Sequence, residues 1–501
     1  MNSTAAPVSA PASPRVIPRS EHTISRSAIS PNALRVLYRL RDGGFQAFLV
    51  GGCVRDLLLG LEPKDFDVAT DALPEQVKKL FRNSRLVGRR FRLAHVFFGQ
   101  ETIEVATFRA ASAPSQAEEP IPDADPEEGE APEVDEPADL EPPGASTLEG
   151  RPQTFGPAPT APYDDDSQRA VDETGRILRD NVYGSINEDV WRRDFTANSL
   201  YYNIADFSLW DYVGGAEDIA SRTLRLIGDP ETRYREDPVR MLRAIRFEAK
   251  LGFHLDPATE APLIPLRELL GGVPSARLFD ETLKLFLSGH GARGLEVLRE
   301  RGLLAALLPT VDDYFVRHPG SLVEKLLIQG LKNTDARVLA GKPVTPTFLF
   351  ALLLYGPIAQ AIEATPPEHW HELATILDAC DRAVRDVQAE VAIPRRFALG
   401  IREMFALQPR LEHPRGRRAL KVLEHPRFRA AFDLLLLRAE HGLAAREMAE
   451  WWTRVQEVSP PERAEMADAL AGSSPQGERR EGARRGPRRR RRRRGRSTHP
   501  A

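Results

Sequence analysis

Strand and helix patterns alternate along the first hundred residues of the chain. Helical spacing of apolar residues, short apolar runs and period-two alternation each mark separate segments. They predict, in order, a helix over 32–40, a strand over 45–50, a helix over 54–59, a strand over 65–70, a helix over 74–81 and a strand pair over 95–98 and 102–108. Glycines 43–44, 51–52 and 99 separate several of these segments. This order is typical of a mixed sheet with helices.

The second half of the chain has only helical periodicity. From residue 238 to about 458 the apolar positions recur three or four residues apart, as in Phe279, Leu283 and Phe286. No repeat of fixed period interrupts this pattern. We therefore predict an α+β fold class, in which a mixed sheet with helices is followed by an all-helical region.

Charge is strongly segregated along the 501 residues, although the net charge is only −3. Residues 118–166 contain sixteen acids and one base, and residues 479–496 contain twelve arginines and one acid. Such segments cannot bury enough apolar surface to fold alone. We predict a disordered N-terminal segment (1–30), a sheet domain (31–225) with a disordered acidic insertion (111–168), a helical region (226–290), a helical body (291–465) and a disordered arginine-rich tail (466–501).

Several protein classes are excluded by composition. Cys53 and Cys380 are the only cysteines, too few for a disulfide framework or a four-cysteine zinc site. The longest apolar run, 348–355, is shorter than the roughly 18 residues of a membrane span, and the N-terminus lacks the order of a signal peptide. No Walker A loop, G-x-S-x-G turn or H-E-x-x-H helix is present. We expect a cytoplasmic protein without a membrane partner.

The strongest chemical signal is a diglycine, Gly51-Gly52, followed by the pair Asp65 and Asp67. Side chains two apart on a strand share a face, so both carboxylates would lie together while Phe66 faces the core. Mg²⁺ commonly binds one or two carboxylates together with substrate phosphates. Glycine lets backbone amides approach a triphosphate without a Cβ in the way. A bare D-x-D is more often a solvated strand end, but the order strand, GG, helix, D-x-D is more specific.

These residues resemble the class II nucleotidyltransferases, which include bacterial poly(A) polymerases and CCA-adding enzymes. The matching elements are GGCVRDLLLG with KDFDVAT, RRDFTANSL from residue 192, and EDPVRMLRA from residue 236. They follow one another in the family's order across residues 35–290. The resemblance implies that the head of the protein transfers a nucleotide to an RNA 3′-hydroxyl and releases pyrophosphate.

The resemblance also implies roles for individual residues. Asp65 and Asp67 would hold two Mg²⁺ ions, and Asp194 would be a third catalytic acid. Glu104 is a rival for that third place, because its strand could lie beside the strand of Asp67. Nucleotide binding would involve the residues of all three elements, namely Gly51, Gly52, Arg55, Arg192, Arg193, Glu236, Asp237 and Arg240.

Each role has a plainer structural alternative. Asp194 could cap a helix, Glu104 could be an exposed strand residue, and Arg192 and Arg193 could form surface salt bridges. Glu236 and Asp237 lie one helical turn from Arg240, which is also the spacing of an ordinary surface ion pair. The family implies instead that Asp237 and Arg240 read the edge of the incoming base.

Two features indicate the poly(A) polymerase branch. Residues 89–96, RRFRLAHV, resemble an element of bacterial poly(A) polymerases, although His95 alone is best explained as a structural residue. The second feature is the arginine run, whose residues would bind RNA phosphates: Arg488, Arg489, Arg490, Arg491, Arg492, Arg493 and Arg494. A solvated tail or a protein-recruiting tail is the alternative.

We therefore expect a template-independent enzyme that adds adenylate to RNA 3′ ends from ATP and serves RNA processing and turnover. The expected partners are RNA 3′ ends, ATP and the RNA-degradation machinery, and the expected state is a monomer. A CCA-adding enzyme that uses CTP as well as ATP is one alternative. A non-catalytic RNA-binding scaffold is another.

Overall fold

A computed structural model describes residues 13–88, 92–110, 170–171, 177–179 and 182–472 of the chain. These residues form two compact units, one within residues 1–405 and one within residues 406–501. The acidic stretch 118–166 and the arginine run 488–494 lie outside the described residues.

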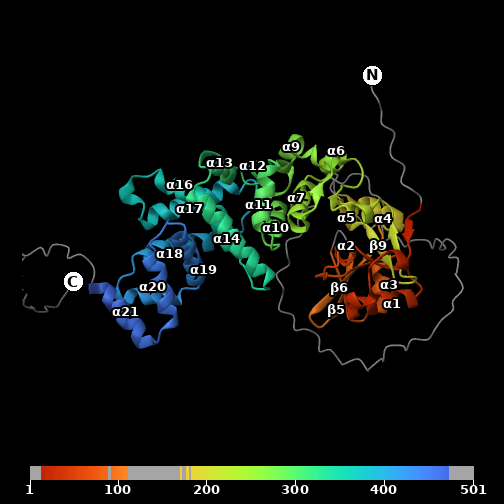
Figure 1. The fold of residues 1–501 in the computed structure, drawn as a ribbon, viewed down its shortest axis with the longest axis horizontal. Helices are drawn as coiled ribbons and strands as arrows, with labels where there is room; N and C mark the ends of the chain where they lie inside the picture. Colours follow the sequence, from red (N-terminus) through yellow and green to blue (C-terminus); the bar gives the residue numbers. More distant parts are fainter. Residues whose placement is uncertain (1–12, 89–91, 111–169, 172–176, 180–181, 473–501) are drawn as a thin grey trace, which may run out of the picture. The chain divides into compact units, whose positions relative to one another are not determined.

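The first unit contains an eight-stranded mixed sheet, and we call the part of the chain that contains it the head (Figure 1). In spatial order its strands are β1 (Arg15–Ile17), β10 (Leu209–Asp211), β9 (Leu200–Asn203), β2 (Ala47–Val50), β3 (Asp67–Thr70), β6 (Glu101–Thr107), β5 (Leu93–Phe98) and β4 (Ser84–Val87). Neighbouring strands are antiparallel except β3 and β6, which are parallel. The expected mixed sheet is confirmed, and strands β1, β4, β9 and β10 are additions to the four strands predicted from the sequence.

One face of this sheet is buried over its central strands. It carries Leu49, Val68, Val105, Ala94 and Val96, which are all at most 2% exposed. Helix α1 (Pro31–Asp42) packs on strands β2, β3 and β6, and α3 (Pro74–Leu80) packs on β4, β5 and β6. Helix α2 (Gly52–Leu58) packs on β2 and β9. The predicted helices 32–40, 54–59 and 74–81 thus form close to their expected positions.

The opposite face is covered on one half only. There, Phe48, Val50 and Tyr201 form a cluster with Val190 of helix α4 (Ile186–Arg192). Ser185 caps α4 through a capping box with Glu188, which fixes where the helix begins. The half of this face on β6, β5 and β4 carries exposed side chains.

The expectation that residues 1–30 are disordered is wrong for residues 13–30. Strand β1 forms an edge of the sheet against β10, and Ile17, Ile24 and Ile29 are buried. Three widely spaced isoleucines leave no periodic pattern in a segment rich in serine and proline, so only tertiary packing orders it.

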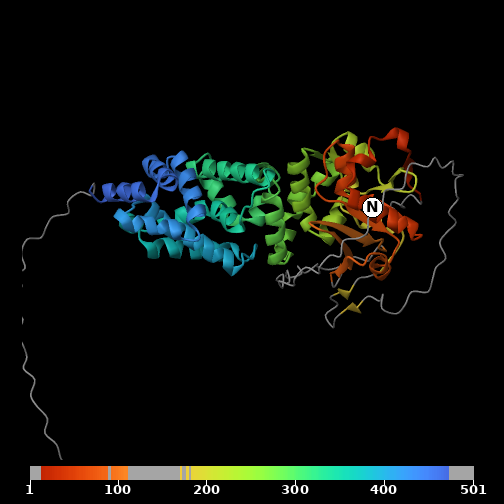
Figure 2. The ribbon, with the colours of Figure 1, turned by 90° about the horizontal axis from the view of Figure 1, so that it is seen from below.

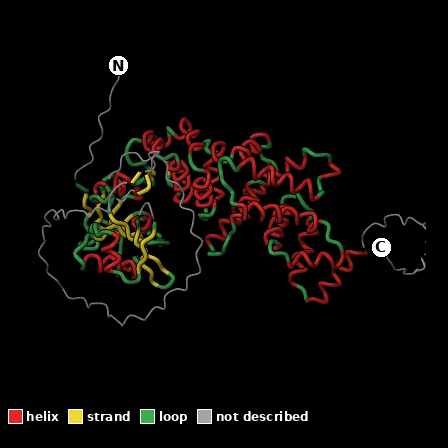
Figure 3. The backbone as a smooth tube through the Cα atoms, turned by 180° about the vertical axis from the view of Figure 1, so that it is seen from behind, coloured by secondary structure: helices red, strands yellow, loops and turns green. Residues whose placement is uncertain are grey.

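The remainder of the first unit is helical, as expected (Figures 2 and 3). The short remaining strands are the pairs β7 (Ala170–Val171) with β8 (Ile177–Arg179) and β11 (Thr223–Leu224) with β12 (His254–Leu255). The helices that follow the sheet are α5 (Gly215–Ala220), α6 (Pro230–Glu236), α7 (Val239–Leu251), α8 (Pro257–Glu260), α9 (Leu263–Leu266), α10 (Ser275–Phe286), α11 (Gly291–Glu300), α12 (Leu304–Leu307), α13 (Pro309–Arg317), α14 (Leu322–Leu339), α15 (Pro346–Leu353), α16 (Tyr355–Glu363), α17 (Leu373–Val387) and α18 (Arg395–Glu412). We call residues 226–290 the neck.

Of the described helices, none on its own has the length and apolar character of a membrane span. The pair α15 and α16, bent by 49°, meets that test only jointly, by length and composition.

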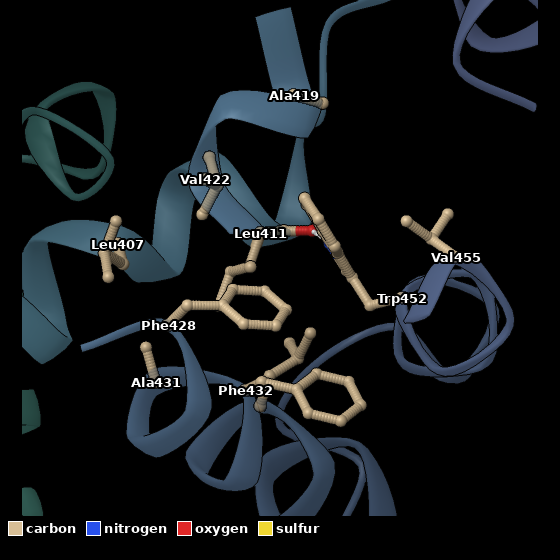
Figure 4. Packing of buried hydrophobic residues seen from close by; sticks show 10 residues of the cluster. Leu407, Leu411, Ala419, Val422, Phe428, Ala431, Phe432, Trp452 and Val455 are labelled. Carbon is tan, nitrogen blue, oxygen red and sulfur yellow. Dashed lines mark hydrogen bonds between the residues drawn. The ribbon is translucent and has the colours of Figure 1, made fainter. Parts of the chain in front are cut away.

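The second unit is organised around Trp452, which is fully buried (Figure 4). Its indole nitrogen donates to the carbonyl of Leu411 at 2.8 Å, so the one polar atom of this ring is satisfied. This unit contains the end of α18 from residue 406, a 3-10 helix (Gly416–Glu424) and the helices α19 (Phe428–Glu440), α20 (Arg446–Glu457) and α21 (Pro460–Gly472). Met466 packs against the cluster and Ala467 is buried. The predicted tail therefore remains helical from residue 466 to residue 472.

Candidate active site

The aspartate pair lies at the start of strand β3. The strand begins at Asp67, and Asp65 precedes it rather than lying on it as expected. Phe66 is 8% exposed, whereas Asp65 is exposed and Asp67 is half-buried. The predicted alternation therefore holds, because the aromatic ring faces the core and neither carboxylate does.

Glu104 lies directly beside Asp67. The parallel pairing of β3 with β6 puts the two residues opposite one another. Burial, followed by repulsion from Glu104, raises the pKa of Asp67 to about 6, and the charge of Asp65 acts in the same direction. Three negative charges are thus concentrated at one position of the sheet.

Gly51 is required next to these acids. Its φ of 83° favours glycine, and a Cβ there would lie 3.6 Å from Oδ2 of Asp67 and 3.9 Å from Nη1 of Arg193. A side chain at this position would project between the two charged groups. At Gly52 a Cβ would lie 3.4 Å from Nη2 of Arg55. The diglycine therefore leaves the space beside Asp67 open.

Arg193 is held rigidly at the end of helix α4. Its Nε donates to the hydroxyl of Tyr201 at 2.9 Å and its Nη2 donates to Asp189 at 3.1 Å. Burial disfavours its charge, but Tyr201 and Asp189 outweigh that effect and hold the pKa of Arg193 above its ordinary value. Its positive charge in turn lowers the pKa of Asp67, against the larger opposing effects. Arg193 is thus a fixed cation beside the carboxylates.

Arg55 and Arg192 are placed differently from Arg193. The side chain of Arg55 is 3% exposed, bonds Asp56 at 2.6 Å and donates to Oδ1 of Asn198 at 2.6 Å. Arg192 is half-buried, and its carbonyl accepts a bond from Arg233. The guanidinium of Arg55 thus joins helix α2 to the segment after Arg193.

Asp194 is bonded to the neck. Its Oδ2 accepts from Nε of Arg243 at 2.7 Å and from Nη2 at 2.5 Å, while Oδ1 accepts from the amide of Phe195. Burial alone would raise the pKa of Asp194, but Arg243 outweighs it and holds the pKa below its ordinary value. Of the two candidates for the third acid, the structure brings Glu104, and not Asp194, opposite Asp67.

The acids of the neck are also bonded to arginines. Glu236 accepts from Arg233 at 2.8 Å and from Arg240 at 3.1 Å. Asp237 is bonded to Arg277 of helix α10 at 2.8 Å. The expected pairing at helical spacing is present for Glu236 and Arg240. Asp237 is bonded instead to Arg277, which lies forty positions later in the chain.

The carboxylates at β3 and β6 suit a metal ion whose remaining ligands are supplied by a substrate. Among the described residues, no group of three or more His, Cys, Asp or Glu side chains could hold an ion unaided. Mg²⁺ usually keeps waters and binds one or two carboxylates plus phosphates, so a ready-made cage is not needed. A cation bound here would offset the repulsion between carboxylates that helps to raise the pKa of Asp67.

Sequence reasoning missed the residues that hold the others in place. Asp189 lies four residues before Arg193 on one helix, so its contact could have been found from spacing. Tyr201, Asn198 and Arg277 are brought in by strand pairing and helix packing and leave no local signal. The predicted roles of the site residues stay predictions, and Arg488–Arg494 lie outside the described residues.

Family models and a curated relative match most of the chain. The family model described as "Poly A polymerase head domain" matches residues 47–225, and "Polymerase A arginine-rich C-terminus" matches residues 368–496. A third, described as "Probable RNA and SrmB- binding site of polymerase A", matches residues 252–315. The poly(A) polymerase I of Salmonella typhimurium is 46% identical over 91% of this chain and 88% of its own length. The chain belongs to the poly(A) polymerase family.

A curated CCA-adding enzyme and a solved structure resemble the chain at lower sequence identity. A CCA-adding enzyme of Bacillus velezensis is 31% identical over 56% of this chain and 56% of its own length. A solved structure described as a tRNA-processing enzyme in an apo form is 21% identical and superposes with a TM-score of 0.53, covering 88% of this chain and 97% of its own. This structural likeness shows a shared fold with a sheet-containing head followed by helices.

Proposed function

We propose that this chain adds adenylate residues to RNA 3′ ends from ATP without a template. The observation that supports this most strongly is the 46% identity to a poly(A) polymerase I over 88% of the length of that protein. The match to the CCA-adding enzyme extends over only about half of each chain.

In the proposed reaction the RNA 3′-oxygen attacks the α-phosphorus of ATP. An O3′–P bond forms, the bond from the α-phosphorus to the bridging oxygen of the β-phosphate breaks, pyrophosphate leaves, and the hydroxyl proton passes to solvent. Two bound Mg²⁺ ions would lower the pKa of the attacking hydroxyl and neutralise charge on the pyrophosphate. Asp65 and Asp67 would hold them, and Glu104 is our candidate for the third acid.

The remaining residues would bind and orient the nucleotide. Arg193, fixed by Asp189 and Tyr201, lies where a triphosphate passing Gly51 would meet a positive charge. The arginines bonded to Glu236 and Asp237 hold these two acids in place, so that the side chains of the neck can select adenine. Fixed dipoles and charges of this kind account for most catalysis of transfer at phosphorus.

A nucleotide-choice assay tests the proposed function. Purified protein is incubated with Mg²⁺ and either oligoadenylate or a tRNA that lacks its CCA end, and with ATP, CTP or both. We expect sustained addition from ATP alone on both RNAs, with pyrophosphate released in proportion. Addition that needs CTP and stops at a completed CCA end would instead identify a CCA-adding enzyme. The absence of pyrophosphate release with every nucleotide would leave an RNA-binding scaffold.

The proposal includes the arginine run 488–494 as an RNA-binding tail. Deletion of residues after Gly472 should weaken RNA binding and flatten its salt dependence, because each neutralised phosphate releases counterions. An unchanged salt slope would contradict this role. A cytoplasmic location, a monomeric state and contact with the RNA-degradation machinery belong to the same proposal.

A further inference from the structure

A row of polar side chains runs outward from Asp67 across the head sheet. Strand register pairs Asp67 with Glu104, Glu104 with His95, and His95 with Arg85. Residues directly opposite one another on neighbouring strands share a face. At a strand spacing of about 4.8 Å, the row from β3 to β4 extends about 14 Å.

This row lies on the half of the face that α4 leaves open. On the covered half Phe48, Val50 and Tyr201 are at most 2% exposed. On the open half Phe97 is 41% exposed and Val87 is 39% exposed, next to the exposed side chains of Glu104 and Arg85. Single exposed apolar residues are ordinary, but the ring of Phe97 shares the face of the row and lies two positions beyond His95, whereas Val87 lies on the other side of the row, opposite Leu93. The row and these two residues make up the open surface.

A hollow of about 290 Å³ opens next to this surface. It is lined by Lys64, Asp65, Phe66, Gln100, Glu101 and Thr102. Thr102 is the strand partner of Phe97, so one wall of the hollow continues into the exposed ring. The hollow thus connects one of the two aspartates to the open surface.

The proposed position of the ATP triphosphate indicates which substrate lies on this surface. Gly51 and Arg193, where the triphosphate would run, lie on the β2 side of Asp67. Glu104 and the open surface lie on its β6 side. In an in-line displacement the attacking oxygen and the leaving pyrophosphate are on opposite sides of the phosphorus. The RNA 3′-hydroxyl must therefore approach from the β6 side.

We propose that the open half of the head sheet binds the 3′-terminal nucleotide of the RNA that is to be extended. This inference rests on the proposed function and extends it to a primer site outside residues 252–315, where the RNA-binding family model matches. The terminal base stacks on Phe97, and a backbone phosphate lies at Arg85, at the far end of the row. Stacking on an aromatic ring accepts any base, as an enzyme that acts on many RNA ends requires.

The charges of the row agree with this orientation. Glu104 and Asp65 repel phosphate, so the uncharged ribose and base of the terminal nucleotide face them, and the phosphate of a nucleotide further upstream lies near Arg85, about 10 Å from Glu104 and about 14 Å from Asp67. His95 lies between the two ends, with Nε2 at 3.5 Å from Oε1 of Glu104 and its ring edge-on to Phe97. It is a positioning residue for Glu104 and for the ring.

Fluorescence of a 3′-terminal 2-aminopurine tests the stacking directly. The full chain is titrated with an RNA that ends in 3′-deoxy-2-aminopurine, which cannot be extended. Wild-type protein should quench the fluorophore, Phe97→Ala should not, and Phe97→Trp should restore quenching. In steady-state extension, Phe97→Ala should raise KM for the primer by about 5- to 150-fold and leave KM for ATP unchanged. Arg85→Ala should weaken primer binding and lower the salt slope by about one.

Matched controls lie at the opposite edge of the same sheet. Val16, which is 51% exposed, and Arg15 both lie on strand β1. Val16→Ala and Arg15→Ala should leave quenching, primer KM and salt slope unchanged. Unfolding midpoints of all variants should equal that of the wild type, because the replaced side chains are exposed.

Equal quenching by wild type and Phe97→Ala, or equal primer KM values, would overturn the inference. The proposed function would survive that result, because wild-type addition of adenylate is measured separately. If the wild type failed to add adenylate but still quenched the fluorophore through Phe97, the proposed function would fail while the binding surface remained.

Discussion

In the head sheet, Asp65, Asp67 and Glu104 lie close together, and none of them is bonded to an arginine or lysine among the described residues. At the start of the neck and just before it, Asp194, Glu236 and Asp237 are each bonded to at least one arginine. The two sets have the same chemistry and different surroundings. Burial and repulsion raise the pKa of Asp67, whereas Arg243 holds the pKa of Asp194 low.

The contrast indicates what each set can bind. Carboxylates that are not bonded to an arginine or lysine have a high affinity for cations that come from outside, such as Mg²⁺ with a triphosphate. Carboxylates bonded to arginines are neutralised, and what they present is a rigid pattern of donors and acceptors. Such a pattern suits an uncharged base. The comparison thus separates the proposed site of bond making from the proposed site of nucleotide choice.

The largest effect is expected at Asp67. Asp67→Ala should lower kcat for AMP addition by at least about 1000-fold, because the metal ligand that positions the transferred phosphate is lost. Primer extension with Mg²⁺-ATP measures this. Asp42→Ala, in an exposed ion pair of helix α1, is the control and should keep full activity. A variant at Asp67 that still turned over would remove this residue from the mechanism.

The next effect distinguishes the two candidates for the third acid. Asp194→Asn should lower the free energy of unfolding by about 1–2 kcal/mol, because the half-buried Arg243 loses the carboxylate to which it is bonded. Glu104→Gln should leave the free energy of unfolding unchanged and lower kcat about 100-fold. Urea unfolding and primer extension on both variants measure these quantities. The reverse result, a stable and inactive Asp194→Asn with an active Glu104→Gln, would make Asp194 the catalytic acid.

Removal of the charge at Asp67 should stabilise the fold. The pKa of Asp67 is about 6 in the folded protein against an ordinary 3.8, so the folded state keeps a proton that the unfolded chain loses as pH rises between these values. Asp67→Asn should therefore raise the free energy of unfolding by about 1–2 kcal/mol above pH 6 and by nothing below pH 4. Urea unfolding at pH 8 and pH 4 without metal checks this. Addition of Mg²⁺-ATP should raise the Tm of the wild-type protein but not the Tm of the Asp67→Asn variant.

The smallest effect concerns the paired acids of the neck. Arg277→Ala should release Asp237 and lower the preference for ATP over CTP by about 5- to 10-fold, with kcat for ATP little changed. Competition between the two nucleotides in primer extension measures this preference. Arg235→Ala is the control, because Arg235 bonds Glu231 on the surface of the same helix that ends at Glu236, and both side chains are more than half exposed. An equal preference in both variants would mean that Asp237 does not need its arginine partner.

Much of this site could be predicted from local sequence. The order of strand β2, the diglycine, helix α2 and the aspartate pair follows from apolar runs and turn residues. The direction of Phe66 away from Asp65 and Asp67 follows from the period of an extended chain. The helices after residue 238 follow from three- and four-residue spacing, whereas the short strand β12 within that region does not. Each of these signals arises within a few residues of the feature that it predicts.

Tertiary structure alone decided which charges distant in the sequence meet. Asp67 faces Glu104 because β3 pairs in parallel with β6, and a shift of one residue in that register would turn Glu104 to the other face. Arg243 and Arg277 reach their partners across 49 and 40 residues of chain. Residues 13–30 are ordered only by the edge strand that they join. Sequence patterns reflect the preference of each segment for helix, strand or turn. These contacts depend instead on packing between segments, which no local pattern encodes.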